Sequence, residues 1–201
     1  MSLAAALDRV AELQALLQPA APAPVAAASS AQPTTTFSSA LATASASSPA
    51  ATASAGGAST AGRAALAAAQ PELGVAEQPP GSNDSPRIAQ YRSAVAGAPG
   101  PGPWCAYFVS WAARQAGAPL GDYGQGFGRV DDIWSWAQRS RRTTDTPSPG
   151  DLVVWDEHVG IVQSVAPDGS ITTVEGNSSD KVSQRTYGAD HGGAVGFVRI
   201  G

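Results

Sequence analysis

The composition of this chain changes abruptly along its length, and the change limits where a hydrophobic core can form. Residues 20–82 are rich in Ala, Ser, Thr and Pro and contain few large apolar side chains. A segment of this kind cannot bury enough apolar surface to offset the entropy lost on ordering, so it predicts a flexible tether. The core must form elsewhere, and residues 85–201 are long enough for one small domain.

We divide the chain into three parts on this basis. Residues 1–18 carry large apolar side chains at helical spacing, which predicts a short amphipathic helix that Pro19 ends. Residues 19–84 form the predicted disordered linker, in which Gly62 to Ala69 has the composition of a transient helix. Residues 85–201 form the predicted folded domain.

Charge and hydropathy exclude several classes of function. The first helix has no basic segment before it and is interrupted by charges, so it predicts neither a Sec signal peptide nor a membrane span. Residues 85–201 carry ten basic and eleven acidic side chains, and this near balance gives no basic surface for a nucleic acid.

Cys105 is the only cysteine, so an intrachain disulfide and a thiolate zinc site are both excluded. An inert buried residue and a nucleophile remain open. The Gly/Pro loop 97–103 cannot be helical, whereas apolar residues recur at helical spacing after Cys105 until Gly117. Cys105 is therefore predicted in the first turn of a helix, where the helix dipole and free backbone N–H groups favour a thiolate. This position favours the nucleophile.

A reactive thiol needs a base, and the chain has only His158 and His191 as the usual candidates. His191 lies in a glycine-rich loop, which predicts a surface position. His158 opens a predicted strand that runs to Val165, and a turn over residues 166–169 leads to a return strand.

The simplest register of this hairpin brings polar side chains together. If Val165 pairs with Ser170, His158 lies opposite Asn177. Gly160 then lies opposite Glu175. Because side chains alternate between the two faces of a strand, the imidazole, the carboxylate and the amide share one face. Either Glu175 or Asn177 could orient the histidine and stabilise its protonated form.

With these pieces in order, residues from about Arg87 to Ile200 resemble a CHAP domain. This is a cysteine, histidine-dependent amidohydrolase/peptidase of the papain-like superfamily, which also holds the NlpC/P60 hydrolases. The resemblance rests on four segments: Trp104–Trp111 with Gly117, Pro149–Trp155, His158–Val162 and Val174–Asn177. It implies an α+β, papain-like fold in which the Cys105 helix packs on an antiparallel sheet of about four to six strands.

The resemblance also implies roles for single residues. Cys105 would be the nucleophile, His158 the base and Glu175 the residue that orients His158. Asn177 would be a second orienter or help to bind the oxyanion, and Trp104 would form a wall of the substrate groove. Some members of the family bind calcium in an acidic loop before the cysteine. Residues 96–103 contain no carboxylate, so no metal or other cofactor is expected here.

The family mostly cuts bacterial peptidoglycan. We therefore expect a peptidoglycan amide hydrolase, either an N-acetylmuramoyl-L-alanine amidase or a stem or cross-bridge endopeptidase. A non-catalytic protein that binds peptidoglycan or an assembly partner is the alternative, and a thiol acyl-transfer enzyme on this fold is a third. The N-terminal part resembles flagellum-associated cell-wall hydrolases of actinobacteria, which implies a partner for helix 1–18. It also implies action at the cell wall after export without a Sec signal.

Overall fold

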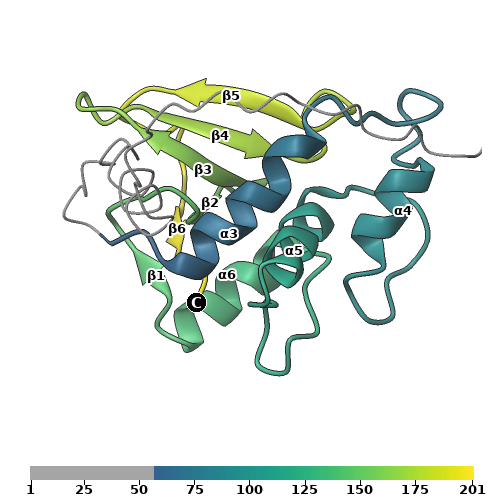
Figure 1. The fold of residues 1–201 in the computed structure, drawn as a ribbon, viewed down its shortest axis with the longest axis horizontal. Coiled ribbons are helices and arrows are strands. Elements are labelled where there is room, and N and C mark those ends of the chain that lie inside the picture. The colour runs from purple at the N-terminus through teal and green to yellow at the C-terminus, as the bar shows by residue number, and fades with distance from the viewer. Residues whose placement is uncertain (1–56) are drawn as a thin grey trace, which may run out of the picture. The chain divides into compact units, whose positions relative to one another are not determined.

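The computed structural model describes residues 57–201, which form an α+β unit (Figure 1). The helix expected over residues 1–18 and the part of the expected linker up to residue 56 lie outside the described residues. Helices pack on a six-stranded antiparallel sheet, as expected for the papain-like class. No helix within residues 57–201 is both long and apolar enough to cross a membrane.

The sheet has the strand order β1-β6-β2-β3-β4-β5, and every neighbouring pair is antiparallel. The predicted hairpin is present as β3 and β4. The polar edge strand β5 was not predicted, because its sequence has no buried face to mark it. The strands are β1 (Thr143–Thr144), β2 (Leu152–Val154), β3 (Val159–Val165), β4 (Ile171–Glu175), β5 (Ser183–Tyr187) and β6 (Gly196–Val198).

Each face of the sheet carries its own apolar cluster, because side chains alternate along a strand. The larger cluster joins Leu152, Val154 and Ile161 to the helices. The smaller cluster, on the other face, contains Val153 and Val162 and is bordered by partly buried aromatic side chains. The four helices in the described part of the chain are α3 (Thr60–Ala69), α4 (Pro86–Arg92), α5 (Cys105–Gln115) and α6 (Val130–Arg139).

Helix α5 begins at Cys105, as the sequence predicts. Phe108, Val109 and Ala112 of the predicted apolar stripe are fully buried, whereas Ala116 at its end is partly buried. The burial extends almost all around the helix, because α3 and α4 pack on α5 in addition to the sheet (Figure 1).

Helix α3 lies inside the segment that composition assigns to the linker, so the structure differs from that expectation for residues 60–69. Its buried positions are Gly62, Ala65, Leu66 and Ala69, a helical stripe made mostly of small residues. Alanine has the highest helix propensity, and small side chains let the helix approach α5 closely. Composition does not predict such a stripe, because a count of large apolar residues leaves out the small residues that form it.

The contact between α3 and the turn before β2 is very close. A Cβ at Gly62 would lie 2.8 Å from the carbonyl oxygen of Gly150, and a Cβ at Gly150 would lie 2.2 Å from the carbonyl carbon of Gly62. Gly150 also has φ of +91°, in the region that favours glycine. Ser59 caps α3 by accepting from the Gly62 N–H at 2.8 Å, and its hydroxyl donates to the carbonyl of Ile200.

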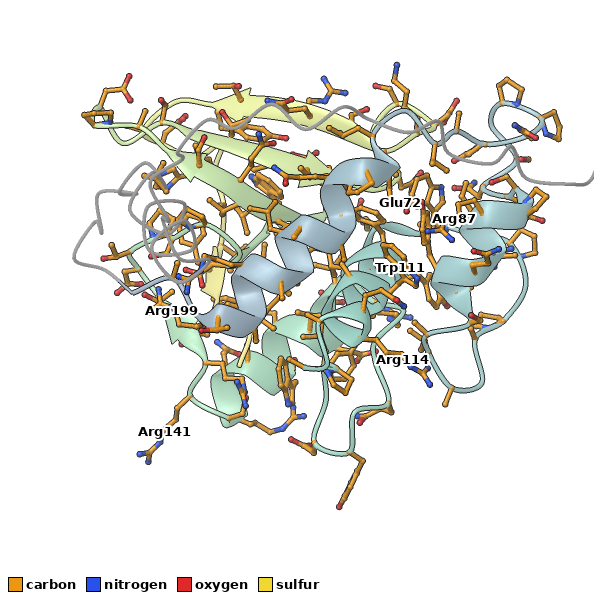
Figure 2. All side chains as sticks on the ribbon, viewed as in Figure 1. Glu72, Arg87, Trp111, Arg114, Arg141 and Arg199 are labelled. Carbon is orange, nitrogen blue, oxygen red and sulfur yellow. The ribbon has the colours of Figure 1, made fainter. Side chains whose placement is uncertain are left out.

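The segment after α3 is held by partly buried polar contacts (Figure 2). Glu72 accepts hydrogen bonds from the Arg87 guanidinium, with Nε at 2.8 Å, and from the Tyr91 hydroxyl at 2.6 Å. The same guanidinium lies 5.0 Å from the ring centre of Trp111 on α5. Residues 70–91 are therefore tied to the helix that carries Cys105.

The hairpin register differs from the prediction near its turn and agrees with it near His158. Val165 pairs with Ile171, so the loop is one residue longer than expected. A bulge between Val162 and Ser164 then shifts the pairing by one residue, and Ile161 pairs with Val174 as predicted. The two deviations cancel, which preserves the expected face for the polar residues.

Asp151, from the Pro-Gly-Asp segment, is fully buried and anchors the last strand. Its carboxylate accepts from Arg199 Nε at 3.1 Å and from Arg199 Nη2 at 3.0 Å, and from the backbone N–H of Ser148 at 2.9 Å. Figure 2 shows Arg199 directed into the protein, whereas Arg141 points away from it.

Replacing Arg199 tests this contact. Arg199→Ala leaves a buried carboxylate without its cation, so the free energy of unfolding should fall by about 3 kcal/mol. Urea unfolding followed by circular dichroism measures the change. Arg139→Ala, at an exposed position in the last turn of α6, is the control and should change the value by less than about 0.5 kcal/mol. Equal effects of the two substitutions would contradict the assignment.

Candidate active site

The candidate site forms where the start of α5 meets the end of the sheet at which β3 begins and β4 ends. The Cys105 side chain is nearly buried, with its sulfur 4.0 Å from the carbonyl oxygen of Glu157. A Cβ at Gly176, just after β4, would lie 2.6 Å from the Cβ of Phe108. Glycine at this position therefore lets α5 approach the sheet and brings the thiol to the residue before His158.

His158 lies between the thiol and a buried carboxylate. Its Nε2 lies 2.9 Å from Oε2 of Glu175, and interaction with the Cys105 side chain raises the pKa of His158. A carboxylate can only accept, so Nε2 carries a proton and Nδ1 is left for the thiol. The structure thus brings together all three residues that the sequence singles out as a nucleophile, a base and an orienting acid.

Glu175 is held by more donors than the histidine alone. The Thr173 hydroxyl donates to its Oε1 at 2.6 Å, and the Tyr187 hydroxyl donates to the same oxygen at 2.9 Å. The Glu175 side chain is only 1% exposed. The absence of a Cβ at Gly160 makes room for it, because a Cβ there would lie 2.7 Å from Glu175 Cγ.

These contacts shift the pKa values of the site in directions that favour charged partners. Burial alone would lower the pKa of His158, but hydrogen bonds and charge interactions with Cys105 and Glu175 raise it to about 9. Burial alone would raise the pKa of Glu175, but hydrogen bonds from His158 and Thr173 hold it below its usual value. Burial and the neighbouring Glu175 charge raise the pKa of Tyr187 to about 12. At neutral pH the arrangement therefore favours an ionised Glu175 beside a protonated imidazole.

A cleft of about 700 Å³ opens onto Cys105. One wall is the Gly/Pro loop that precedes the helix, and the others are residues 128–131 and the turn at Asp156 and Glu157. The first N–H groups of a helix have no acceptor within the helix. Those at the start of α5 could therefore stabilise an oxyanion formed by attack of the thiol.

Trp104 does not line this cleft. Its side chain is fully buried, stacks on Tyr91 with ring centres 5.8 Å apart, and donates through Nε1 to Glu77 at 2.9 Å. A fully buried indole has no surface for a substrate, so the structure gives Trp104 a different place from the expected groove wall. Trp104 immediately precedes α5 and packs in the core, away from the cleft.

Asn177 and His191 lie apart from the central contacts. Asn177 follows the end of β4 with φ of +58°, and within residues 57–201 its side chain makes no hydrogen bond to Cys105 or His158. Its role toward a substrate stays a prediction. His191 contacts the carbonyl oxygen of Gly169 through Nε2 at 3.0 Å, away from the cleft.

A comparison with protein-family models bears on the same residues. The family model described as the CHAP domain matches residues 97–177, which include Cys105, His158 and Glu175. This part of the chain is a CHAP domain.

Other likenesses are slight. A crystal structure of N-acetylmuramoyl-L-alanine amidase from Staphylococcus aureus is similar to this chain with 23% identity and a TM-score of 0.41. The match covers 50% of this chain and 31% of the amidase chain, so this chain spans under a third of that protein. At these values the likeness carries no argument about function. No curated protein matches the sequence.

Sequence reasoning missed contacts on both sides of the CHAP domain. Tyr187 lies on the unpredicted strand β5, and Glu77 lies in the expected linker. Thr173 could have been found, because it is two residues before Glu175 on one strand and must share its face. Trp155 packs on the imidazole of His158 with ring centres 5.7 Å apart, which only the structure reveals.

Gly160→Ala tests whether the position of Glu175 controls the thiol of the CHAP domain. The new Cβ would displace the Glu175 side chain and weaken its bond to His158, so we expect the alkylation rate of Cys105 by iodoacetamide at pH 7 to fall about tenfold. Mass spectrometry of the alkylated chain measures the rate. Gly57→Ala, where a Cβ meets no atom within 4 Å, is the control. An unchanged rate in a folded Gly160→Ala protein would show that Glu175 does not act on the thiol.

Proposed function

We propose that the CHAP domain of this chain hydrolyses an amide bond in bacterial peptidoglycan by nucleophilic catalysis. Cys105 attacks the carbonyl carbon, His158 acts as the general acid and base, and Glu175 orients His158. The observation that carries the proposal is the 2.9 Å contact of the His158 imidazole with the buried carboxylate of Glu175, next to the Cys105 thiol, which lies against the carbonyl of Glu157 and lines an open cleft. The CHAP family supplies the substrate class.

The reaction follows from the charges of the site. The thiolate of Cys105 adds to the amide carbonyl, and backbone N–H groups at the start of α5 stabilise the oxyanion. The protonated imidazole then donates its Nδ1 proton to the leaving amine, and the C–N bond breaks to leave a thioester. Water, deprotonated by the neutral imidazole, adds to the thioester carbonyl. The C–S bond then breaks, which releases the acid and restores the Cys105 thiolate beside the protonated imidazole. Glu175 stabilises the imidazolium throughout.

The bond that is cut is either the N-acetylmuramoyl-L-alanine amide or an amide of the stem or cross-bridge. Cleavage of the first bond separates the whole stem peptide from the glycan, whereas cleavage of the others leaves part of the stem attached, so mass analysis of released muropeptides distinguishes them. Action on the cell wall would place the enzyme outside the cytoplasm. The helix that the sequence predicts over residues 1–18 would then bind a protein partner.

Substitutions at Cys105 and at the two histidines test the proposal, with the His191 variant as the control. Cys105→Ala should lower the rate of peptidoglycan solubilisation by about 1,000-fold or more, and His158→Gln by about 100- to 10,000-fold. His191→Gln should keep full activity, because His191 lies outside the cleft. Release of soluble muropeptides measures the rate.

The other outcomes are also informative. If wild type and Cys105→Ala solubilise peptidoglycan equally, the thiol is not the nucleophile. If neither releases product but both sediment with the polymer, the chain is a non-catalytic binder. Ligated rather than hydrolysed products would indicate acyl transfer.

The pH dependence of the reaction provides a separate test. His158 must be protonated to donate to the leaving amine, and its pKa is raised to about 9. The value of kcat/KM should therefore fall as the pH rises through about 9. Glu175→Gln removes a negative charge that raises this pKa, so the alkaline limb should move to lower pH. A limb that stays in place after this substitution would assign the titration to another group.

A further inference from the structure

The two oxygens of the Glu175 carboxylate accept hydrogen bonds from different partners. Oε2 faces the His158 Nε2, whereas both hydroxyl donors, from Thr173 and Tyr187, converge on Oε1 at 2.6 and 2.9 Å. The two oxygens are thus assigned to different partners. A carboxylate held at Oε1 by two donors cannot rotate without breaking at least one strong bond, so Oε2 remains directed at the imidazole.

The two hydroxyls reach Glu175 from different elements. Thr173 lies on β4 two residues before Glu175, on the same face and fully buried. Tyr187 ends the neighbouring strand β5, where it pairs with Ile171. Its ring packs against Trp155 with centres 4.9 Å apart, and the ring of Trp155 packs in turn on that of His158. Sheet pairing and ring packing therefore fix where the Tyr187 hydroxyl points.

We propose that Tyr187 and Thr173 are positioning residues of the active site, which keep Glu175 ionised and directed at His158. This inference rests on the catalytic role proposed above for Glu175. Neither residue lines the cleft, so they act on the reaction only through the carboxylate. Tyr187 lies beyond the matched part of the CHAP domain, and its contact makes β5 part of the catalytic unit.

The physical reason is the cost of a buried charge. A carboxylate that is 1% exposed has lost its hydration, and each hydrogen bond to the charged form offsets part of that loss. Two titratable groups are hydrogen-bonded to Glu175. His158 bonds to it from the residue before β3, and Tyr187 bonds to it from β5. Cys105 acts on His158 from α5, and Arg185 acts on Tyr187 from β5.

Proton NMR of the full chain measures the effect without any substrate. The chain has two histidines, so the His158 ring signal can be assigned from the spectrum of His191→Gln. This signal should shift twice during a pH titration, first slightly when Glu175 titrates and then strongly when His158 itself titrates. Tyr187→Phe and Thr173→Val should each move the first step to higher pH, and the double variant should move it further.

Matched substitutions separate this effect from general damage. Tyr123→Phe removes the hydroxyl of a tyrosine that is 95% exposed, and Thr172→Val changes the other face of β4. Both should titrate like wild type. Thr173→Ser keeps the hydroxyl and should restore the wild-type titration. If Thr173→Val does not fold, Tyr187→Phe alone decides. A folded Tyr187→Phe protein whose first step is unmoved would overturn the proposal.

Kinetics add a second measurement. For each lost hydroxyl, kcat on peptidoglycan should fall about tenfold with KM unchanged, because the cleft is intact. A change in KM alone would place Tyr187 in substrate binding and overturn its positioning role. If wild type does not hydrolyse peptidoglycan but the NMR steps move as expected, the proposed function fails while the role of the hydroxyls toward Glu175 stands.

Discussion

A carboxylate removed from water must find hydrogen-bond donors inside the protein, and Glu175 finds three. This requirement explains much of the sheet around it. Strand β5 must pair with β4 so that Tyr187 reaches the carboxylate, and Gly160 must lack a side chain so that Glu175 fits above β3. The thiol lies at the end of the sheet, against the carbonyl of Glu157 and next to His158, the residue before β3.

The same requirement recurs at three other buried acids, and each of them joins segments that are distant in the chain. Glu72 binds Arg87 and Tyr91, Glu77 binds the indole of Trp104, and Asp151 binds Arg199. Two of these acids lie before the matched CHAP region. Glu77 contacts Trp104 at the start of α5, whereas Glu72 contacts Arg87 and Tyr91 on α4, which packs on α5. The position of the nucleophile therefore depends on a segment whose composition predicts a linker.

Part of this could be predicted from sequence, for identifiable reasons. Helical periodicity and the preceding Gly/Pro loop located the start of α5 at Cys105, and strand alternation placed His158 and Glu175 on one face. The register near the turn was wrong by one residue, and the bulge at residue 163 corrected it before the site. Small-residue packing of α3 and the polar edge strand β5 could not be predicted, because neither has the large apolar pattern that marks a core element.

The close contact between Gly62 and Gly150 has a consequence for where this domain can be cut. Neither glycine can gain a side chain while the other segment is in place, so the two positions act as one constraint on residues 88 apart in the sequence. A fragment that begins at residue 85 would expose the apolar surface that Ala65, Leu66 and Ala69 now cover. Such a fragment would contain the complete family motif and still be prone to aggregate, because the smallest autonomous unit is larger than the motif.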